Sequence, residues 1–350
     1  MTKTEAGHPR AHVAVDPHTP AFHFTAPRGW LNDANGLCQW DGTFHLFYQH
    51  NPAAPVHDRI HWGHATSIDL VHWHDEPIAL APSVGPDADG CWSGVLVNDN
   101  GTPTLVYSGH APSQRRTQTC CIATGTPDLR SWTKLSDNPV IDGPPAELDV
   151  TEFRDHTVWR ANGRWHQAIG SGIVGRGGAL LHFSSDDLRH WDYEGPLLTA
   201  ERMPAGGPFA GTTWECPDVF PLPTADGGRD HVAIFSAWDY GETLYPLYAT
   251  GHLTAGRFVS ATALRHLDLG LRHFYAPQSF TAGDGRRSQF GWAQEARPEP
   301  AILQAGWCGV MSLPRELSLS SDGQLEAAPA REVDALRIGD GEYLSLTEGT

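Results

Sequence analysis

The chain has 350 residues and carries 24 Lys and Arg against 41 Asp and Glu, a formal net charge of −17. This acidity, without any run of basic residues, argues against nucleic acid or an anionic membrane as a partner. Its 37 Gly, 27 Pro and 13 Trp are typical of a turn-rich, aromatic-rich all-β protein rather than a helical one.

The N-terminal segment, residues 1–21, lacks the apolar core of a secretory signal peptide. We interpret it as a loose leader and expect a cytoplasmic protein. No later stretch approaches the roughly 20 apolar residues of a membrane span, so we expect no membrane partner. The six cysteines have neither disulfide-framework nor zinc spacing, which agrees with a reducing compartment.

The first notable stretch is HFTAPRGWLNDANG, residues 23–36. Its apolar run ends in Asn32 and Asp33, and the pair Asn35-Gly36 then predicts a tight turn. An acid at a strand end, immediately before a turn, would sit on a rigid element and face open space, as a catalytic nucleophile must. By itself, Asp33 fits an ordinary turn acid better than a nucleophile, because Asp before Gly or Asn is common in loops.

Two markers recur along the chain and predict a repeat fold. A Gly-led turn followed by an apolar strand recurs, at intervals of 57 to 65 residues, at Gly42, Gly101, Gly163, Gly228 and Gly285. An Asp-Leu pair with Trp three residues after the Leu recurs, at intervals of 59 residues, from Asp69, Asp128 and Asp187. A shared period near 60, repeated five times in a chain of short strands and turns, indicates a closed architecture such as a propeller.

The expected blades follow in chain order. The first would run from Asp33 to about Trp73, and the others would open near residues 90, 151, 212 and 273. Helical periodicity of useful length is absent. We therefore expect a five-bladed all-β propeller with little helix.

Upstream of each repeated glycine lies one polar residue at a similar place: Asp33, Ser93, Asp155, Glu215 and Tyr275. If the repeat is real, these residues end equivalent strands, which converge on the central channel of a propeller. Three of the five are carboxylates. Because like charges in one cavity raise each other's pKa and destabilise a purely structural core, their coincidence predicts a catalytic site.

Twenty histidines raise the question of a metal site. The best-supported group comprises His57, His61, His64, His72 and His74. No H-E-x-x-H motif accompanies them, and the surrounding segment has the pattern of strand and loop. We expect no bound metal.

Three ordered motifs, WLNDANG (30–36), FRD (153–155) and WECPD (214–218), resemble the signatures of glycoside hydrolase family 32, the invertase, levanase and inulinase family. Supporting segments include FYQHNP (47–52) and FYAPQSF (274–280), and the likeness covers about residues 22–338. It implies three parts. These are a leader (1–21), a five-bladed β-propeller catalytic domain (22–312), and a linker or start of a truncated or absent C-terminal β-sandwich (313–350).

The resemblance implies hydrolysis of terminal β-fructofuranosides with retention, with no metal or organic cofactor. Asp33 would be the nucleophile, Glu215 the general acid and base, and Asp155 the transition-state stabiliser. The expected sugar-binding residues are Asn32, Gln49, Trp62, Trp92, Ser93, Arg154, Cys216, His273 and Tyr275. Retention requires two carboxyl groups about 5–5.5 Å apart. Glu215 must hold a proton, which an apolar neighbour such as Trp214 would favour.

The chain departs from the family pattern in four places. Ala34 and His156 each stand where proline usually follows the acid, which we expect to loosen a turn. His273 stands where many members have an acid near the leaving group, so the preference between sucrose and fructan stays open. The chain stops at Thr350, and a propeller flank left uncovered predicts a homo-oligomer or poor solubility.

Three functions remain open from the sequence. The favoured one is a fructoside hydrolase, because all three acids are present at equivalent strand ends. A fructosyltransferase would use the same residues with a sugar in place of water, and a non-catalytic sugar-binding propeller would not need them. In each case the partner is a small-molecule sugar, whether sucrose, its phosphate, or inulin-type or levan-type oligomers.

Overall fold

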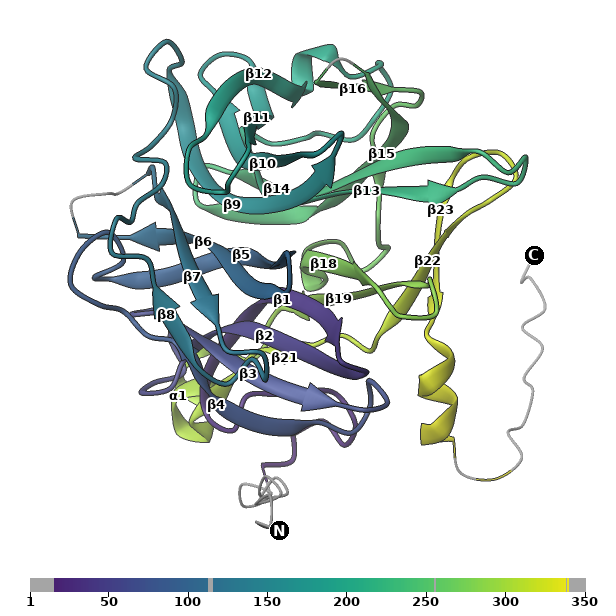
Figure 1. The fold of residues 1–350 in the computed structure, drawn as a ribbon. Helices are drawn as coiled ribbons and strands as arrows, with labels where there is room; N and C mark the ends of the chain where they lie inside the picture. Colours follow the sequence, from purple (N-terminus) through teal and green to yellow (C-terminus); the bar gives the residue numbers. More distant parts are fainter. Residues whose placement is uncertain (1–15, 113–115, 255, 338, 340–350) are drawn as a thin grey trace.

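A computed structural model describes residues 16–112, 116–254, 256–337 and 339, and it has five β-sheets arranged around one axis (Figure 1). The first strands of the sheets contact one another in a closed ring: β1 (Gly29–Trp40), β5 (Gly90–Asp99), β9 (Val150–Ala161), β13 (Thr213–Pro223) and β18 (Tyr275–Thr281). This is a five-bladed β-propeller, and the blades open close to the residues that the repeat predicted.

Antiparallel strands extend each blade outward. Blade I adds β2 (Thr43–Asn51), β3 (His61–Ser67) and β4 (His74–Leu80); blade II adds β6 (Thr102–His110), β7 (Thr119–Gly125) and β8 (Trp132–Lys134). Blade III adds β10 (Arg164–Ile173), β11 (Gly177–Ser185) and β12 (Asp192–Thr199). Blade IV adds β14 (Arg229–Asp239), β15 (Glu242–Thr254), β16 (Arg257–Ser260) and β17 (Arg265–His266). Blade V adds β19 (Arg287–Ala293), β21 (Val310–Met311), β22 (Arg315–Leu319) and β23 (Leu325–Pro329).

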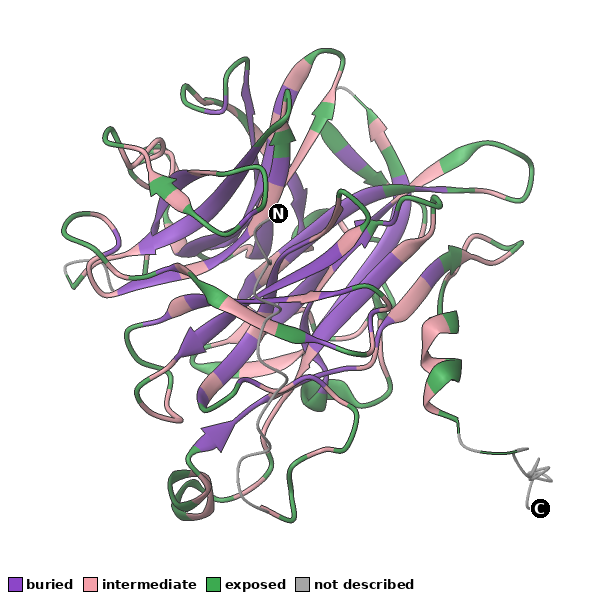
Figure 2. Ribbon diagram, turned by 60° about the horizontal axis from the view of Figure 1, so that its bottom comes forward, coloured by how far each residue is buried: buried purple, intermediate pink, exposed green. Residues whose placement is uncertain are grey.

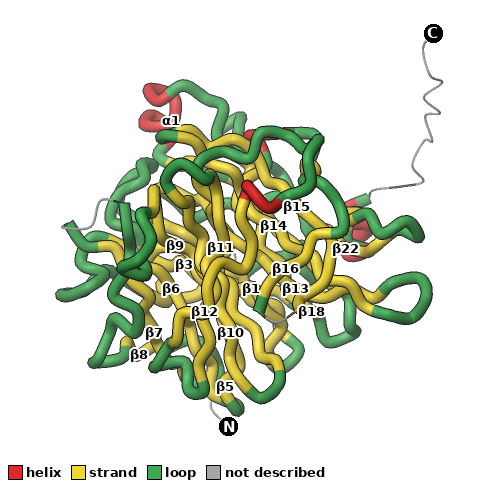
Figure 3. Tube along the Cα trace, turned by 90° about the horizontal axis from the view of Figure 1, so that it is seen from above, coloured by secondary structure: helices red, strands yellow, loops and turns green. Residues whose placement is uncertain are grey.

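Helices are few and short in the described residues, as the missing helical periodicity predicted. They are α1 (Glu299–Ala305) and the 3₁₀ turns η1 (Ala200–Arg202), η2 (Leu271–His273) and η3 (Arg331–Leu336). Seen from above, strands fill the interior and loops lie around them (Figure 3). No helix of the described residues is long and apolar enough to cross a membrane.

The core lies between the blades because each inner strand is covered on both faces. Eight of the nine residues of β2 are buried, so this strand has no solvent-facing side. Figure 2 shows the same burial running through the central strands of the sheets. In blade IV, the fully buried Trp214 stacks on Phe235 with ring centroids 3.8 Å apart, and the pair belongs to one buried cluster with Leu180 and Leu198 of blade III. Stacked blades therefore bury what a single four-stranded sheet leaves exposed.

The Asp-Leu-Trp marker forms one recurring turn between the third and fourth strands of blades I to III. The leucines, Leu70, Leu129 and Leu188, have left-handed φ values of 62°, 57° and 66°. In each turn the aspartate accepts a backbone N–H from two residues further on, at 3.0, 3.2 and 2.8 Å. The tryptophan indole N–H then donates to the leucine carbonyl at 3.1, 3.1 and 2.8 Å. The marker therefore reflects a real structural repeat.

Each of the five first strands contains a β-bulge near its start. The pairing register shifts around Asp33, Ser93, Asp155, Cys216 and Ala276. A bulge inserts one residue into one strand and re-aims the neighbouring side chains, here toward the axis. The five axial residues predicted from the repeat therefore lie at or beside bulges; four of them are inside their strands, and Tyr275 is the first residue of β18.

The turn expected at Asn35-Gly36 does not form, because β1 continues without a break to Trp40. Gly36 instead takes a left-handed φ of 52° within the second irregularity of the β1–β2 ladder. Ala34 and His156 likewise lie in paired strands, so neither loosens a turn. Local residue preference suggested a turn, but pairing with the long β2 and β10 neighbours satisfies more backbone groups.

Residues 307–311 close the ring of blades. The short strand β20 (Trp307–Cys308) pairs in parallel with β1, and β21 then pairs with β19 of blade V. Gly309 between them has φ 88°, and an added Cβ would lie 1.8 Å from the Leu31 carbonyl oxygen. This segment therefore depends on a glycine to lie directly behind the strand that carries Asp33.

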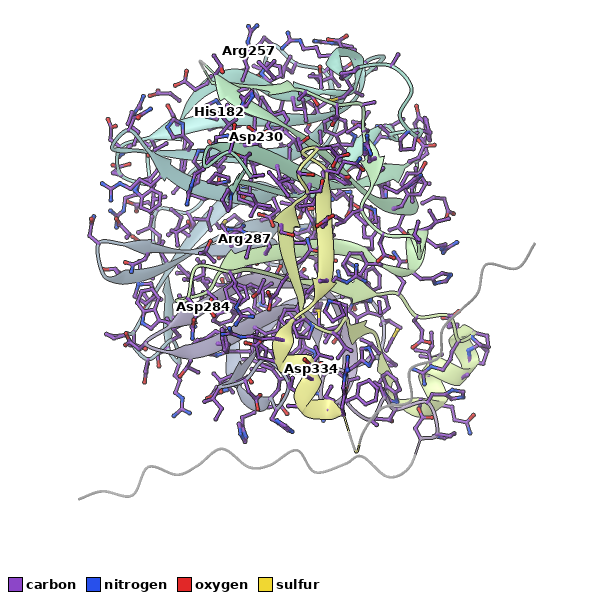
Figure 4. The ribbon with its side chains drawn as sticks, turned by 90° about the vertical axis from the view of Figure 1, so that its right-hand side faces the viewer. His182, Asp230, Arg257, Asp284, Arg287 and Asp334 are labelled. Carbon is purple, nitrogen blue, oxygen red and sulfur yellow. The ribbon has the colours of Figure 1, made fainter. Side chains whose placement is uncertain are left out.

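The C-terminal boundary differs from the expected one at residue 312. Strands β22 and β23 pair in series with β19, so the propeller extends to Pro329, because blade V needs them to cover the edge of its second strand. In Figure 4 this hairpin runs down the near side, with Asp334 of η3 below it. The last residues, 340–350, lie outside the described residues.

The leader is only partly described, since residues 1–15 lie outside the described residues. Asp16 accepts hydrogen bonds from Trp307 Nε1 at 2.7 Å and from Arg297 Nη1 at 3.0 Å. The end of the leader is therefore tied to the ring-closing segment.

Gly309→Ala should lower the thermal midpoint of unfolding by an amount that corresponds to about 3 kcal/mol or more, because strain at positive φ adds to a clash with backbone. Gly306→Ala is the matched control, since Gly306 has φ 75° but no atom within 4 Å of the added Cβ. We expect it to cost only about 1 kcal/mol. Equal midpoints for the two variants in a calorimetric scan would contradict this account of ring closure.

Candidate active site

A cavity of about 440 Å³ opens on the axis at the end where the first strands begin. It is lined by Asn32, Asp33, Gln49, His57, Trp92, Ser93, Arg154, Asp155, Glu215, Trp238, Gly241, Thr243, Tyr275 and Trp292. All five axial residues predicted from the repeat are in this set. Each of the five blades therefore contributes at least one residue to the lining of this cavity.

Asp33 is held by donors from two other blades. Ser93 Oγ donates to its Oδ2 at 2.7 Å, and the Cys216 thiol lies 3.4 Å from the same oxygen. Burial raises the pKa of Asp33 to about 6, with a further contribution from the negative charge of Glu215, while the hydrogen bond from Ser93 opposes the shift. Asp33 is therefore mostly ionised above about pH 6.

Asp155 occupies the bulge of β9 with a left-handed φ of 61°. Its backbone N–H donates to Ser108 Oγ at 2.9 Å, and its Oδ2 accepts the Cys216 N–H at 3.0 Å. Burial raises its pKa to about 7, and the charges of Glu215 and Asp33 add to the shift, which Arg154 opposes. The two aspartates therefore change protonation close to neutral pH.

Glu215 is held through both of its carboxylate oxygens. Arg154 donates to Oε1 from Nε at 3.0 Å and from Nη2 at 2.7 Å, and the Tyr275 hydroxyl donates to Oε2 at 2.5 Å. The third guanidinium nitrogen, Nη1, donates to Glu152 Oε2 at 2.5 Å. Arg154 thus bridges two acids and orients Glu215 in the cavity.

Trp214 is not the apolar neighbour of Glu215 that the sequence suggested. Its indole N–H donates to the Ala210 carbonyl at 2.9 Å, and its ring stacks on Phe235 between the blades. Successive side chains of a strand point to opposite faces, so Trp214 faces the core while Glu215 faces the cavity.

The other predicted sugar-binding residues fall into two groups. Asn32, Gln49 and Trp92 line the cavity; Asn32 Oδ1 accepts the Trp30 indole N–H at 2.7 Å, and Gln49 Nε2 donates to the Cys91 carbonyl at 3.1 Å. Trp62 does not line the cavity. It is fully buried and donates to the Trp92 carbonyl at 3.1 Å, so it supports that strand from behind.

His273 is the predicted residue that the structure places elsewhere. It ends the 3₁₀ turn η2, is exposed, and lines a separate cavity together with Phe274 and Arg315. The first strand of blade V begins only at Tyr275, so residues before it stay outside the ring. The structure therefore does not bring His273 to the acids.

Sequence reasoning missed several lining residues. Trp238 and Trp292 lie near the ends of the second strands β14 and β19, which return to the cavity. Their position at the end of a Gly-led strand is a sequence signal that could have identified them. His57 comes from the loop after β2 and carries no periodic signal. Its ring lies edge-on to Trp30 and Trp92, at 5.9 and 5.6 Å, and burial lowers its pKa.

The histidines considered as metal ligands lie apart. His57 faces the cavity, His64 contacts His45 at 3.0 Å, and His72 binds Asp69 at 2.7 Å. Within the described ranges, no group of three His, Cys, Asp or Glu side chains is arranged to hold a metal ion.

Comparison with known proteins gives a match over most of the chain. Residues 23–329 match the family model described as "Glycosyl hydrolases family 32 N-terminal domain". The sucrose-6-phosphate hydrolase of Escherichia coli is 37% identical over 334 residues, which are 91% of this chain and 66% of that protein. The fructan 6-exohydrolase of Beta vulgaris is 36% identical over 358 residues, 94% of this chain and 57% of that protein.

Comparison with solved structures also gives a match over most of the chain. A variant of fructan 1-exohydrolase IIa from Cichorium intybus, in complex with 1-kestose, superposes with a TM-score of 0.80 at 30% identity. The match covers 91% of this chain and 62% of that one. The chain thus spans less than two thirds of the length of these relatives.

Asp33→Asn should stabilise the protein at alkaline pH. A folded-state pKa of about 6, above the ordinary 3.8, means that Asp33 favours folding below pH 3.8 and that this contribution is lost as the pH rises through 6. The free energy of unfolding of the variant should therefore exceed that of the wild type at pH 8 by on the order of 1–3 kcal/mol, which raises its thermal midpoint, and the difference should shrink at pH 4.

The control for this comparison is Asp41→Asn, which changes an exposed carboxylate in the β1–β2 turn. Parallel midpoint curves for wild type and Asp33→Asn between pH 4 and 8 would contradict the assigned burial cost.

Proposed function

The chain belongs to glycoside hydrolase family 32, and we propose that it releases terminal β-D-fructofuranosyl units from sucrose or fructo-oligosaccharides by hydrolysis with retention. The observation that carries the proposal is the convergence of Asp33, Asp155 and Glu215 from three blades on one cavity. A retaining glycosidase needs an ionised carboxylate to attack and a second carboxyl group to protonate the leaving oxygen.

In the first step Glu215 gives its proton to the glycosidic oxygen while Asp33 attacks the anomeric carbon. The bond to the leaving sugar breaks as a covalent fructosyl–Asp33 ester forms. In the second step Glu215, now ionised, removes a proton from water, which attacks the ester and releases fructose. The contacts of Glu215 with Arg154 and Tyr275 support this assignment, because they hold the acid in one orientation through both steps.

We assign Asp155 to stabilise the oxocarbenium-like transition state through the ring hydroxyls. Its support is a backbone hydrogen bond from Cys216, the residue directly after Glu215, which keeps Asp155 and the acid in register. Asn32, Gln49, Trp92 and Ser93 line the blade I and II side of the cavity and are the proposed contacts of the fructosyl ring.

Two further features are proposed from the sequence alone. They are a cytoplasmic location and self-association. Light scattering on the purified chain tests the second, since a stable monomer contradicts it.

The purified 350-residue chain should release fructose from sucrose and from short inulin-type and levan-type oligomers, and Asp33→Ala should release none. Loss of the nucleophile leaves no route to the covalent intermediate. Fructose is measured enzymatically, and circular dichroism establishes that the variant is folded. Release by folded Asp33→Ala at the wild-type rate would overturn the assignment of the nucleophile.

Glu215→Gln should lose about 10²–10⁴-fold in kcat/KM on sucrose, and much less on an activated aryl β-fructofuranoside. An alkoxide leaving group needs a full proton from the acid, whereas a phenolate with a low pKa leaves without one. Initial rates on both substrates decide the matter. Equal losses on the two would mean that Glu215 is not the acid.

A further inference from the structure

Glu152 is a buried acid that the proposed mechanism does not use. It stands on β9 two residues before Arg154, and residues two apart in a strand share a face, so both side chains lie on one side of β9 while Phe153 between them faces the core. The Glu152 side chain is 11% exposed. Ser171 Oγ of β10 donates to the Glu152 carbonyl at 2.6 Å, which fixes the backbone of this segment.

Arg154 is shared by two acids. Its Nη1 donates to Glu152 Oε2 at 2.5 Å, and its Nε and Nη2 donate to Glu215 Oε1 at 3.0 and 2.7 Å. All three side chains are mostly buried, so their charges interact more strongly than they would in water. When both acids are ionised, one positive charge serves two negative ones. This arrangement favours a state in which the two acids together retain one proton.

The other titratable groups around this unit add mainly negative charge. Glu215 is faced by Asp33 of blade I, His57 after β2, Arg154 and Asp155 of blade III, Cys216 beside it on β13, and Tyr275 of blade V. Glu152 is faced by Arg154, Glu215 and Arg116. Burial raises the pKa of Glu152, and the charges of Arg154 and Arg116 oppose that shift. Burial lowers the pKa of His57, which therefore contributes no positive charge at neutral pH.

The contacts of Arg154 with Glu215 conflict with the role of a general acid. Hydrogen bonds from a guanidinium favour the ionised form of a carboxyl group, whereas the acid must keep its proton until the glycosidic oxygen takes it. Glu152 opposes this effect in two ways. It holds the third nitrogen of Arg154, and its own negative charge disfavours a second negative charge on the same guanidinium.

On the basis of the proposed function, we propose that Glu152 is a positioning residue for the general acid, which engages Arg154 and thereby keeps the proton on Glu215. The charge of Glu152 sets the alkaline limit of activity. Glu152 touches neither the substrate nor the reacting atoms, and it acts through Arg154 alone.

The test is the pH profile of Glu152→Gln, which removes the charge and keeps the size of the side chain. On sucrose, kcat/KM falls by about tenfold per pH unit on the alkaline side, where the acid has lost its proton. We expect this limb to move to lower pH by on the order of 0.5–1 unit, a loss of about 3- to 10-fold at alkaline pH. The acid limb, which reports Asp33, should stay in place.

Three controls distinguish this role from a structural one. An activated aryl β-fructofuranoside needs no proton from the acid, so Glu152→Gln should leave its alkaline rates unchanged. Glu152→Asp keeps the charge and should restore a profile close to that of the wild type. Glu147→Gln, which removes an exposed carboxylate from the loop before β9, should shift nothing. Circular dichroism establishes folding, and Glu152→Ala replaces Glu152→Gln if the latter does not fold, with the same shift expected.

An unmoved alkaline limb in the folded variant overturns the inference, as does an equal shift on sucrose and on the aryl fructoside. These results differ from failure of the proposed function. If the wild-type chain releases no fructose from either substrate, or shows the same alkaline limb on both, then Glu215 is not the acid and the proposed function is removed. A normal wild-type profile that Glu152→Gln does not change removes only the inference.

Discussion

Burial of three carboxylates at the propeller axis is the constraint on which the rest of the structure depends. Burial and mutual charge raise the pKa of Asp33 to about 6 and of Asp155 to about 7, so the folded protein holds both at a cost near neutral pH. Arg154 offsets part of this cost by bridging Glu215 and Glu152. Apolar packing between the blades, away from the cavity, stabilises the fold against the rest of this free-energy cost.

The same structural feature, a β-bulge, places polar groups at the axis in every blade. A bulge in each first strand aims a polar group at the axis, while the paired segments on either side keep the ring rigid. Closure occurs close to the axial carboxylates, since Gly309 lies against the backbone of Leu31, two residues before Asp33. Ring closure and the placement of Asp33 are therefore one structural event, and the stability of the ring supports a strained, charged centre.

Much of the site could be predicted from the chain. The period near 60 identified Asp33, Ser93, Asp155, Glu215 and Tyr275 as neighbours, and all five line the cavity. The failures came where the repeat carries no information. Asn35-Gly36 has turn chemistry but lies inside a strand, Trp62 supports the wall from behind, and His273 precedes its strand and faces another cavity. Local preference cannot reveal these outcomes, because neighbouring strands decide them.

The sequence by itself determined the number of blades, the residues that begin each one and the set of acids at the axis, because turn spacing and strand patterning are properties of the chain alone. Only the tertiary structure decided which side chains meet across blades: Arg154 with Glu215, Cys216 with Asp33, and the β14–β15 hairpin with the mouth of the cavity. Such contacts join residues about 60 or more positions apart. Their geometry is set by how far each blade rotates about the axis when the ring closes, and no local pattern encodes that rotation.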